Sequence, residues 1–123
     1  MKKILMVDDV STNIKCATEV FKNVKNGYEL LTARSGQKAL DILNDVKPDL
    51  IILDINMPDM DGFELLTIIK GKEDLANVPI IFLTAENDKE SEEKGLSLGA
   101  TDYITKPFGP KILLSRIEKA LAI

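Results

Sequence analysis

Side chains that could perform phosphate chemistry follow several short aliphatic runs of this sequence. Residues 4–7 end on Asp8 and Asp9, residues 50–53 end on Asp54, residues 80–83 end on Thr84, and residues 103–105 end on Lys106. Each of these residue types, taken alone after a strand, is more often an ordinary turn or surface residue. Their recurrence at the ends of several apolar runs favours one shared site.

The acids among these residues indicate a cation. If Asp8, Asp9 and Asp54 lie at one edge of a sheet, their carboxylates repel one another, and their pKa values rise unless a cation lies between them. Oxygen ligands favour Mg²⁺, which leaves coordination positions for water and phosphate oxygens. A carboxylate can also act as a nucleophile and form an aspartyl phosphate. Lys106 would then supply positive charge to the phosphoryl group, and Thr84 a hydrogen bond.

The composition excludes other kinds of site. The 123 residues include no histidine, which excludes serine-histidine-acid triads, histidine-ligated zinc and imidazole catalysis within this chain. A net charge of -4 argues against direct nucleic-acid binding, and no apolar run approaches membrane-spanning length. The one cysteine, Cys16, cannot form an internal disulfide, so we expect a cytoplasmic protein and place Cys16 on a helix as a buried spacer.

Strand-like and helix-like segments alternate along the chain. Strands are predicted at 4–7, 28–33, 50–54, 80–83 and 103–105, and helices at 12–25, from Ser35 as N-cap to Val46, at 63–70, at 88–98 and from Pro110 onward. The helix at 88–98 has few apolar residues and contains Gly95, so we expect it to be the least stable.

This alternation predicts one α/β domain over residues 1–123, with a five-stranded parallel sheet covered by helices on both faces. In the flavodoxin-like strand order 2-1-3-4-5, the switch point lies between the first and third strands. That order would bring Asp8 and Asp9 to face Asp54.

Over essentially its whole length, the sequence resembles a response-regulator receiver domain of two-component signal transduction. The matching motifs are the acidic pair Asp8-Asp9, the segment LDINMPDMDG around Asp54, Thr84-Ala85 after an aliphatic run, and YITKPF at 103–108. Each motif alone is weak, but the four together are specific. The resemblance implies that Asp54 accepts a phosphoryl group from a sensor histidine kinase or a histidine phosphotransfer protein. The donor must be another protein, because this chain has no histidine.

The resemblance also implies roles for the surrounding residues. Asp9 is expected to bind Mg²⁺ directly and Asp8 through water, and the backbone carbonyl of Asn56 is expected to be the third protein ligand. Lys106 is expected to pair with the phosphorylated or metal-bound carboxylate, and its peptide bond to Pro107 is expected to be cis. Thr84 and Tyr103 would form the conformational switch. Asn56 and Glu86 would flank the path of the water that removes the phosphoryl group.

The expected output surface consists of the fourth helix, fifth strand and fifth helix. Phosphorylation would bias this surface between two states and so control a downstream protein, a fused output domain or a phosphorylation-dependent dimer. No nucleic acid or membrane is expected as a direct partner. The segment GLSLGATDYITKPF resembles receivers that precede enzymes of cyclic-dinucleotide synthesis or breakdown.

Two other functions stay open at this point. A phosphohydrolase with an aspartate nucleophile, such as the haloacid-dehalogenase-like enzymes, needs an acid-base carboxylate two residues after the nucleophile, and here that residue is Asn56. We therefore expect a phosphoacceptor that hydrolyses slowly and is not an enzyme acting on other substrates. The second alternative is a binding module, either a flavodoxin-like nucleotide binder or a phosphate-independent receiver. No glycine-rich loop follows the first strand to support nucleotide binding.

Overall fold

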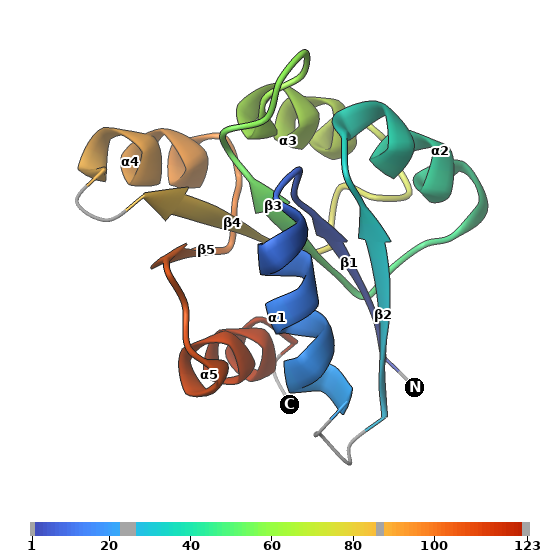
Figure 1. Cartoon of the computed structure of the whole chain (residues 1–123). Helices are drawn as coiled ribbons and strands as arrows, with labels where there is room; N and C mark the ends of the chain where they lie inside the picture. The colour runs from blue at the N-terminus through green and yellow to red at the C-terminus, as the bar shows by residue number, and fades with distance from the viewer. Residues whose placement is uncertain (1, 23–26, 86–87, 122–123) are drawn as a thin grey trace.

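A computed structural model of the chain describes residues 2–22, 27–85 and 88–121. Within these residues, strands and helices alternate as the sequence predicts (Figure 1). The strands are β1 (Lys2–Val7), β2 (Tyr28–Ala33), β3 (Leu50–Asp54), β4 (Ile80–Ala85) and β5 (Asp102–Lys106). The helices are α1 (Ser11–Lys22), α2 (Gly36–Asp45), α3 (Gly62–Lys70), α4 (Lys89–Ser97) and α5 (Pro110–Leu121). Residues 23–25 of the predicted first helix and Glu86 lie outside the described residues.

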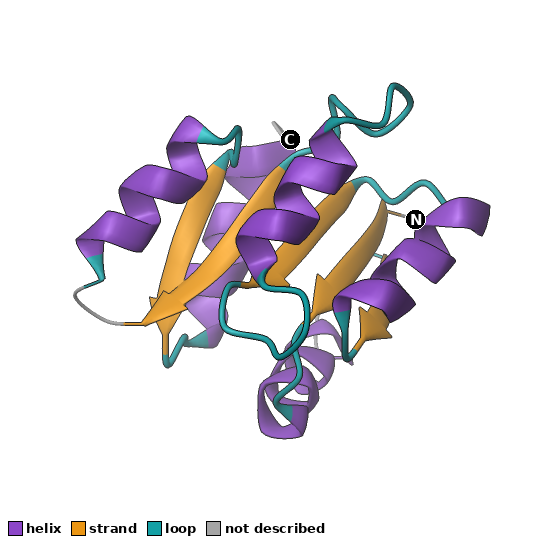
Figure 2. Cartoon of the chain, turned by 90° about the horizontal axis from the view of Figure 1, so that it is seen from above, coloured by secondary structure: helices purple, strands orange, loops and turns teal. Residues whose placement is uncertain are grey.

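The described strands form one parallel sheet of order β2-β1-β3-β4-β5, which confirms the predicted flavodoxin-like topology. The central strand β3 is buried along its whole length. Val7 pairs with Leu53, and Asp54 pairs with Leu83. Neighbouring strands therefore end at nearly the same level, and their carboxyl ends share one edge of the sheet (Figure 2).

Helices cover both faces of the sheet, because alternate strand residues point to opposite sides. On one face, Val7, Leu53 and Phe82 belong to a core cluster with buried residues of α2 and α3. On the other face, Met6, Ile52 and Leu83 belong to a cluster with buried residues of α1 and α5. α4 lies on the first face, since its Gly95 lies against the ring of Phe82 (Figure 1).

The starts of three helices have side-chain caps. Ser35 accepts a hydrogen bond from the backbone N–H of Lys38 at 3.1 Å, which confirms it as the N-cap of α2. Asp61 and Asp88 cap α3 and α4 in the same way. Asp61, in the loop after β3, therefore fixes the start of α3. Pro110 opens α5, as predicted.

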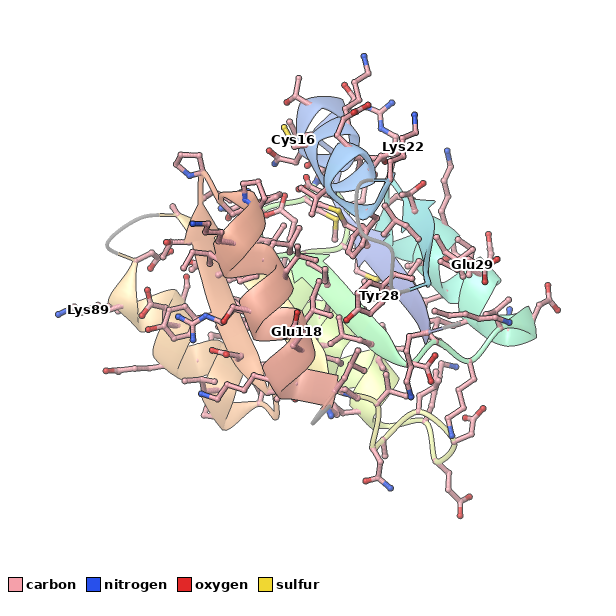
Figure 3. The ribbon with its side chains drawn as sticks, turned by 90° about the horizontal axis from the view of Figure 1, so that it is seen from below. Cys16, Lys22, Tyr28, Glu29, Lys89 and Glu118 are labelled. Carbon is pink, nitrogen blue, oxygen red and sulfur yellow. The ribbon has the colours of Figure 1, made fainter. Side chains whose placement is uncertain are left out.

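One prediction about the α1 side of the sheet is wrong. Cys16 is exposed on α1 and is not a buried spacer (Figure 3). The buried stripe of α1 passes through Ala17 and Phe21, and each helical residue is rotated by about 100° from the one before it, so Cys16 falls outside that stripe.

On the same side of the sheet, burial and the nearby Glu118 carboxylate of α5 raise the pKa of Tyr28.

No helix in the described part of the chain has both the length and the apolar character needed to cross a membrane.

Candidate functional site

The side chains that the sequence singles out gather at the carboxyl edge of the sheet. Asp8 and Asp9 follow β1, Asp54 is the last residue of β3, and Lys106 is the last residue of β5. Thr84 is the last but one residue of β4, which runs two residues beyond the predicted end. Because the strand order places β1 and β4 on either side of β3, Asp54 lies at the centre of this edge.

The three acids form one cluster. Asp8, Asp9 and Asp54 each offer a carboxylate oxygen, and these oxygens all lie within 4.8 Å of one another. Asp8 and Asp54 are fully buried, and Asp9 is partly buried. The chain therefore concentrates negative charge in a place that water reaches poorly, which is costly unless a positive group compensates.

Two oxygens of this cluster have no hydrogen-bond partner among the described residues. They are Oδ1 of Asp9 and Oδ2 of Asp54, and both are buried. A buried polar atom without a partner costs roughly 1–3 kcal/mol, and more when it is charged. A divalent cation bound by oxygen ligands would satisfy both atoms, so these residues fit the Mg²⁺ that the sequence predicts.

The second oxygen of Asp54 is held by two donors. Lys106 Nζ donates to Asp54 Oδ1 at 2.8 Å, and the backbone N–H of Asn56 donates to the same atom at 3.3 Å. The pKa of Asp54 is nevertheless raised, because burial is the largest influence and Asp8 adds repulsion, although Lys106 acts in the opposite direction. The carboxylate thus has one oxygen fixed by the protein and one that is unpartnered.

A glycine allows the loop after β3 to fold back on this acid. Gly62 donates its N–H to the carbonyl of Ile55 at 2.9 Å. A Cβ at Gly62 would lie 2.5 Å from the backbone oxygen of Asp54 and 2.7 Å from Cα of Ile55. No side chain fits there, so the last residue of the segment LDINMPDMDG must be glycine for Asp54 to keep its place.

Two residues that hold the acidic pair were not identified from the sequence. Asn13 Nδ2 donates to Asp8 Oδ2 at 2.9 Å, beside the backbone N–H of Val10, which donates to Asp8 Oδ1 at 2.9 Å. Arg34 donates to the backbone carbonyl of Asp9 at 3.1 Å. The only sequence signal for Asn13 is an amide side chain in the first turn of the helix after the acids, and nothing local indicates Arg34.

Thr84 and Tyr103 lie in different surroundings. The Thr84 side chain is buried, and its hydroxyl makes a long contact of 3.5 Å with the carbonyl of Ala85. Tyr103 is partly buried, and its ring centroid lies 5.9 Å from that of Phe82. A hydrogen bond with Glu92 of α4 raises the pKa of Tyr103. The Tyr103 hydroxyl is therefore directed towards α4.

Two further site features can be placed. Asn56 is exposed beside Asp54, and the peptide bond between Lys106 and Pro107 is cis, as predicted. Glu86, the other residue assigned to the path of the attacking water, lies outside the described residues.

Comparisons with known proteins match nearly the whole chain. The family model of the response regulator receiver domain matches residues 4–118. The chain is 42% identical over 123 residues to the phosphate regulon transcriptional regulatory protein PhoB of Pseudomonas aeruginosa, with 98% of this chain and 52% of that protein covered. It is 40% identical over 118 residues to a "Probable cyclic di-GMP phosphodiesterase" of Vibrio cholerae, with 96% and 26% covered. The chain thus spans about half or less of these relatives.

Solved structures show the same fold. The chemotaxis response regulator CheY4 of Vibrio cholerae superposes with a TM-score of 0.89 at 34% identity, and 98% of each chain is covered. The receiver domain of the sensor histidine kinase PA1611 of Pseudomonas aeruginosa superposes with a TM-score of 0.88 at 27% identity, with 99% of this chain and 98% of that chain covered. The latter structure has a magnesium ion coordinated in its active-site cleft.

Proposed function

The chain belongs to the response regulator receiver domain family, and we propose that Asp54 is its phosphoacceptor. The observation that carries the proposal is the state of the Asp54 carboxylate, which is buried with Oδ1 held by Lys106 and Oδ2 unpartnered beside Asp8 and Asp9. An oxygen of Asp54 attacks the phosphorus of a phosphohistidine on a partner protein. A new O–P bond forms, the N–P bond breaks, and the leaving imidazole takes up a proton.

Mg²⁺ supports this transfer in the proposed reaction. Asp9 would hold the ion directly, Asp8 through water, Asp54 with its free oxygen, and Asn56 with its backbone carbonyl. When bound, the ion neutralises the acidic cluster and the charge of the phosphoryl oxygens. The unpartnered oxygens of Asp9 and Asp54 and the magnesium ion in the PA1611 receiver support this assignment.

Lys106 and Thr84 act on the phosphoryl group in this proposal. Lys106 already reaches Asp54 and would pair with the modified carboxylate. The Thr84 hydroxyl, with its long contact to Ala85, would turn to donate to a phosphoryl oxygen. Tyr103 would then move inward, and the surface of α4, β5 and α5 would change between two states.

The whole of residues 1–123 would act as this receiver domain. The phosphoryl donor would be a sensor histidine kinase or a histidine phosphotransfer protein in the cytoplasm. The output would be a downstream protein, a fused domain or a dimer through the α4-β5-α5 surface. We propose no direct nucleic-acid or membrane contact and no turnover of other substrates.

The test is the intact mass of the protein after incubation with acetyl phosphate. We expect one added phosphoryl group on wild type with Mg²⁺, and none without Mg²⁺ or on the Asp54→Asn variant. Asp59→Asn is the matched control, because Asp59 is an exposed acid of the same loop. Addition to Asp54→Asn, or steady release of phosphate from a small ester without an adduct, would contradict the proposal.

A further inference from the structure

The oxygens of the acidic cluster fall into two groups. Both oxygens of Asp8 accept hydrogen bonds at 2.9 Å, Oδ1 from the backbone of Val10 and Oδ2 from the side chain of Asn13. Oδ1 of Asp9 and Oδ2 of Asp54, in contrast, are buried without a partner among the described residues. The carboxylate of Asp8 is thus fixed in orientation by the protein, while the other two acids keep an oxygen available.

We propose that Asn13 is a positioning residue for the cation site, and that its hydrogen bond to Asp8 sets the affinity of the cluster for Mg²⁺. This inference rests on the proposed function of the same site. Asn13 belongs to α1, which begins at Ser11, only three residues after Asp8. The helix is anchored on the sheet through its buried Ala17 and Phe21. The donor to Asp8 is therefore supplied by a rigid element.

The need for a donor follows from the burial of Asp8. Its side chain is fully buried, and one of its oxygens lies within 4.8 Å of an oxygen of Asp54. Without Asn13, Oδ2 of Asp8 would lose its partner in this buried place, and the carboxylate would be free to rotate. That rotation would reduce the geometric order that a cation meets at the cluster.

The chemistry of the asparagine side chain suits this role. The amide group is neutral at every pH, and its NH₂ must face a carboxylate, which can only accept. An aspartate at the same position would add a fourth carboxylate and no donor. Groups that hold metal ligands through hydrogen bonds commonly change metal affinity by about 10–100-fold when removed.

The test compares Asn13→Ala with Thr12→Ala, an exposed neighbour in the same helical turn. Each protein is titrated with MgCl₂, and the Kd is read from NMR shifts of backbone amides near residues 8–13. We expect about a tenfold weaker Kd for Asn13→Ala, and a Kd within about twofold of wild type for Thr12→Ala. With acetyl phosphate, the Mg²⁺ concentration for half-maximal phosphorylation should rise in parallel, while the rate at saturating Mg²⁺ stays near wild type.

A wild-type Kd in Asn13→Ala would overturn the inference and leave the proposed function intact. An equal loss in Thr12→Ala would also overturn it, because general loosening of α1 would then explain both. If Asn13→Ala does not fold, Asn13→Leu provides the same comparison, since leucine is similar in size to asparagine, has no hydrogen-bond donor and favours a helix. A wild type that binds no Mg²⁺ would remove the proposed function and this inference together, so the wild-type titration distinguishes the two failures.

Discussion

Gly95 of α4 lies directly against the ring of Phe82 in β4, and a Cβ at Gly95 would be only 2.4 Å from Cε1 of that ring. The ring also lies beside Tyr103, at 5.9 Å between centroids. The absence of a side chain at Gly95 therefore brings α4 close to the aromatic pair of β4 and β5. It also brings α4 within reach of the Tyr103 hydroxyl, through Glu92.

Gly95→Ala should lower the stability of the protein. Alanine favours a helix by about 1 kcal/mol over glycine, but overpacking against a buried ring costs about 1–3 kcal/mol. We expect a net loss of up to about 2 kcal/mol in the free energy of urea unfolding. Shortening the opposing side chain with Phe82→Leu should make the alanine less costly in the double variant. The control is Glu93→Ala, which changes an exposed residue of α4. A Gly95→Ala protein more stable than wild type would show that the contact between Gly95 and the Phe82 ring does not limit the packing of α4.

Asp54→Asn should stabilise the protein when Mg²⁺ is absent. The pKa of Asp54 is raised in the folded state above its ordinary value of 3.8. The Asp54 carboxyl therefore makes its full contribution to the free energy of unfolding below that pH. This contribution is lost as the pH rises through the pKa of the folded state. We expect a gain of about 1–2 kcal/mol at neutral pH, which shrinks as the pH falls towards 3.8.

Saturating Mg²⁺ should reverse this order, because the cation stabilises only the protein that binds it. Urea unfolding at several pH values, with and without Mg²⁺, measures both effects, and Asp59→Asn serves as control. Equal stability of Asp54→Asn and wild type at neutral pH without Mg²⁺ would show that the buried charge of Asp54 does not destabilise the fold.

Gly62→Ala should displace the acceptor. The added Cβ would meet the backbone of Asp54 and Ile55, which cannot move aside as a flexible side chain can. We expect a loss of about 2–3 kcal/mol in stability and a fall of at least about tenfold in the phosphorylation rate, since a shift near 1 Å costs about 10²-fold. Gly71→Ala is a matched control, because its nearest heavy atom would be 3.4 Å away. An unchanged rate for Gly62→Ala would be the contrary outcome.

Asp88→Ala should loosen the start of α4. The Asp88 side chain accepts a hydrogen bond from the backbone N–H of Ser91 at 3.2 Å. The side chain of Ser91, and after it this backbone N–H, lower the pKa of Asp88 below 3.8. Its stabilising effect is present above that value and is lost as the pH falls through the folded pKa. Hydrogen exchange of the Ser91 amide should therefore accelerate several-fold in Asp88→Ala at neutral pH. Asp88→Asn should keep most of the protection, because asparagine also caps helices. Equal protection in all three proteins would argue against the cap.

The sequence predicts the strand order and the members of the edge cluster because both depend on local patterns. Aliphatic runs that stop on Asp8, Asp54 and Thr84 define strand ends without reference to distant residues. Parallel pairing then brings those ends together, and the structure bears this out for the three acids.

The missed residues depend on contacts that no local pattern specifies. Arg34 contributes through a backbone carbonyl 25 residues away. From the sequence alone, Gly95 only lowers the expected stability of its helix. The structure shows that it allows α4 to pack closely against the ring of Phe82. The sequence predicts Cys16 to be a buried spacer, but the buried stripe of α1 through Ala17 and Phe21 leaves it exposed.

The alternation of side chains along β4 and β5 places Thr84 and Lys106, the two residues proposed to act on the phosphoryl group of Asp54, on opposite sides of the sheet. Thr84 shares its side of β4 with Phe82, in the layer of α2, α3 and α4, whereas Lys106 shares its side of β5 with Ile104, in the layer of α1 and α5. One chemical change on one carboxylate would thus be felt by both layers through different side chains.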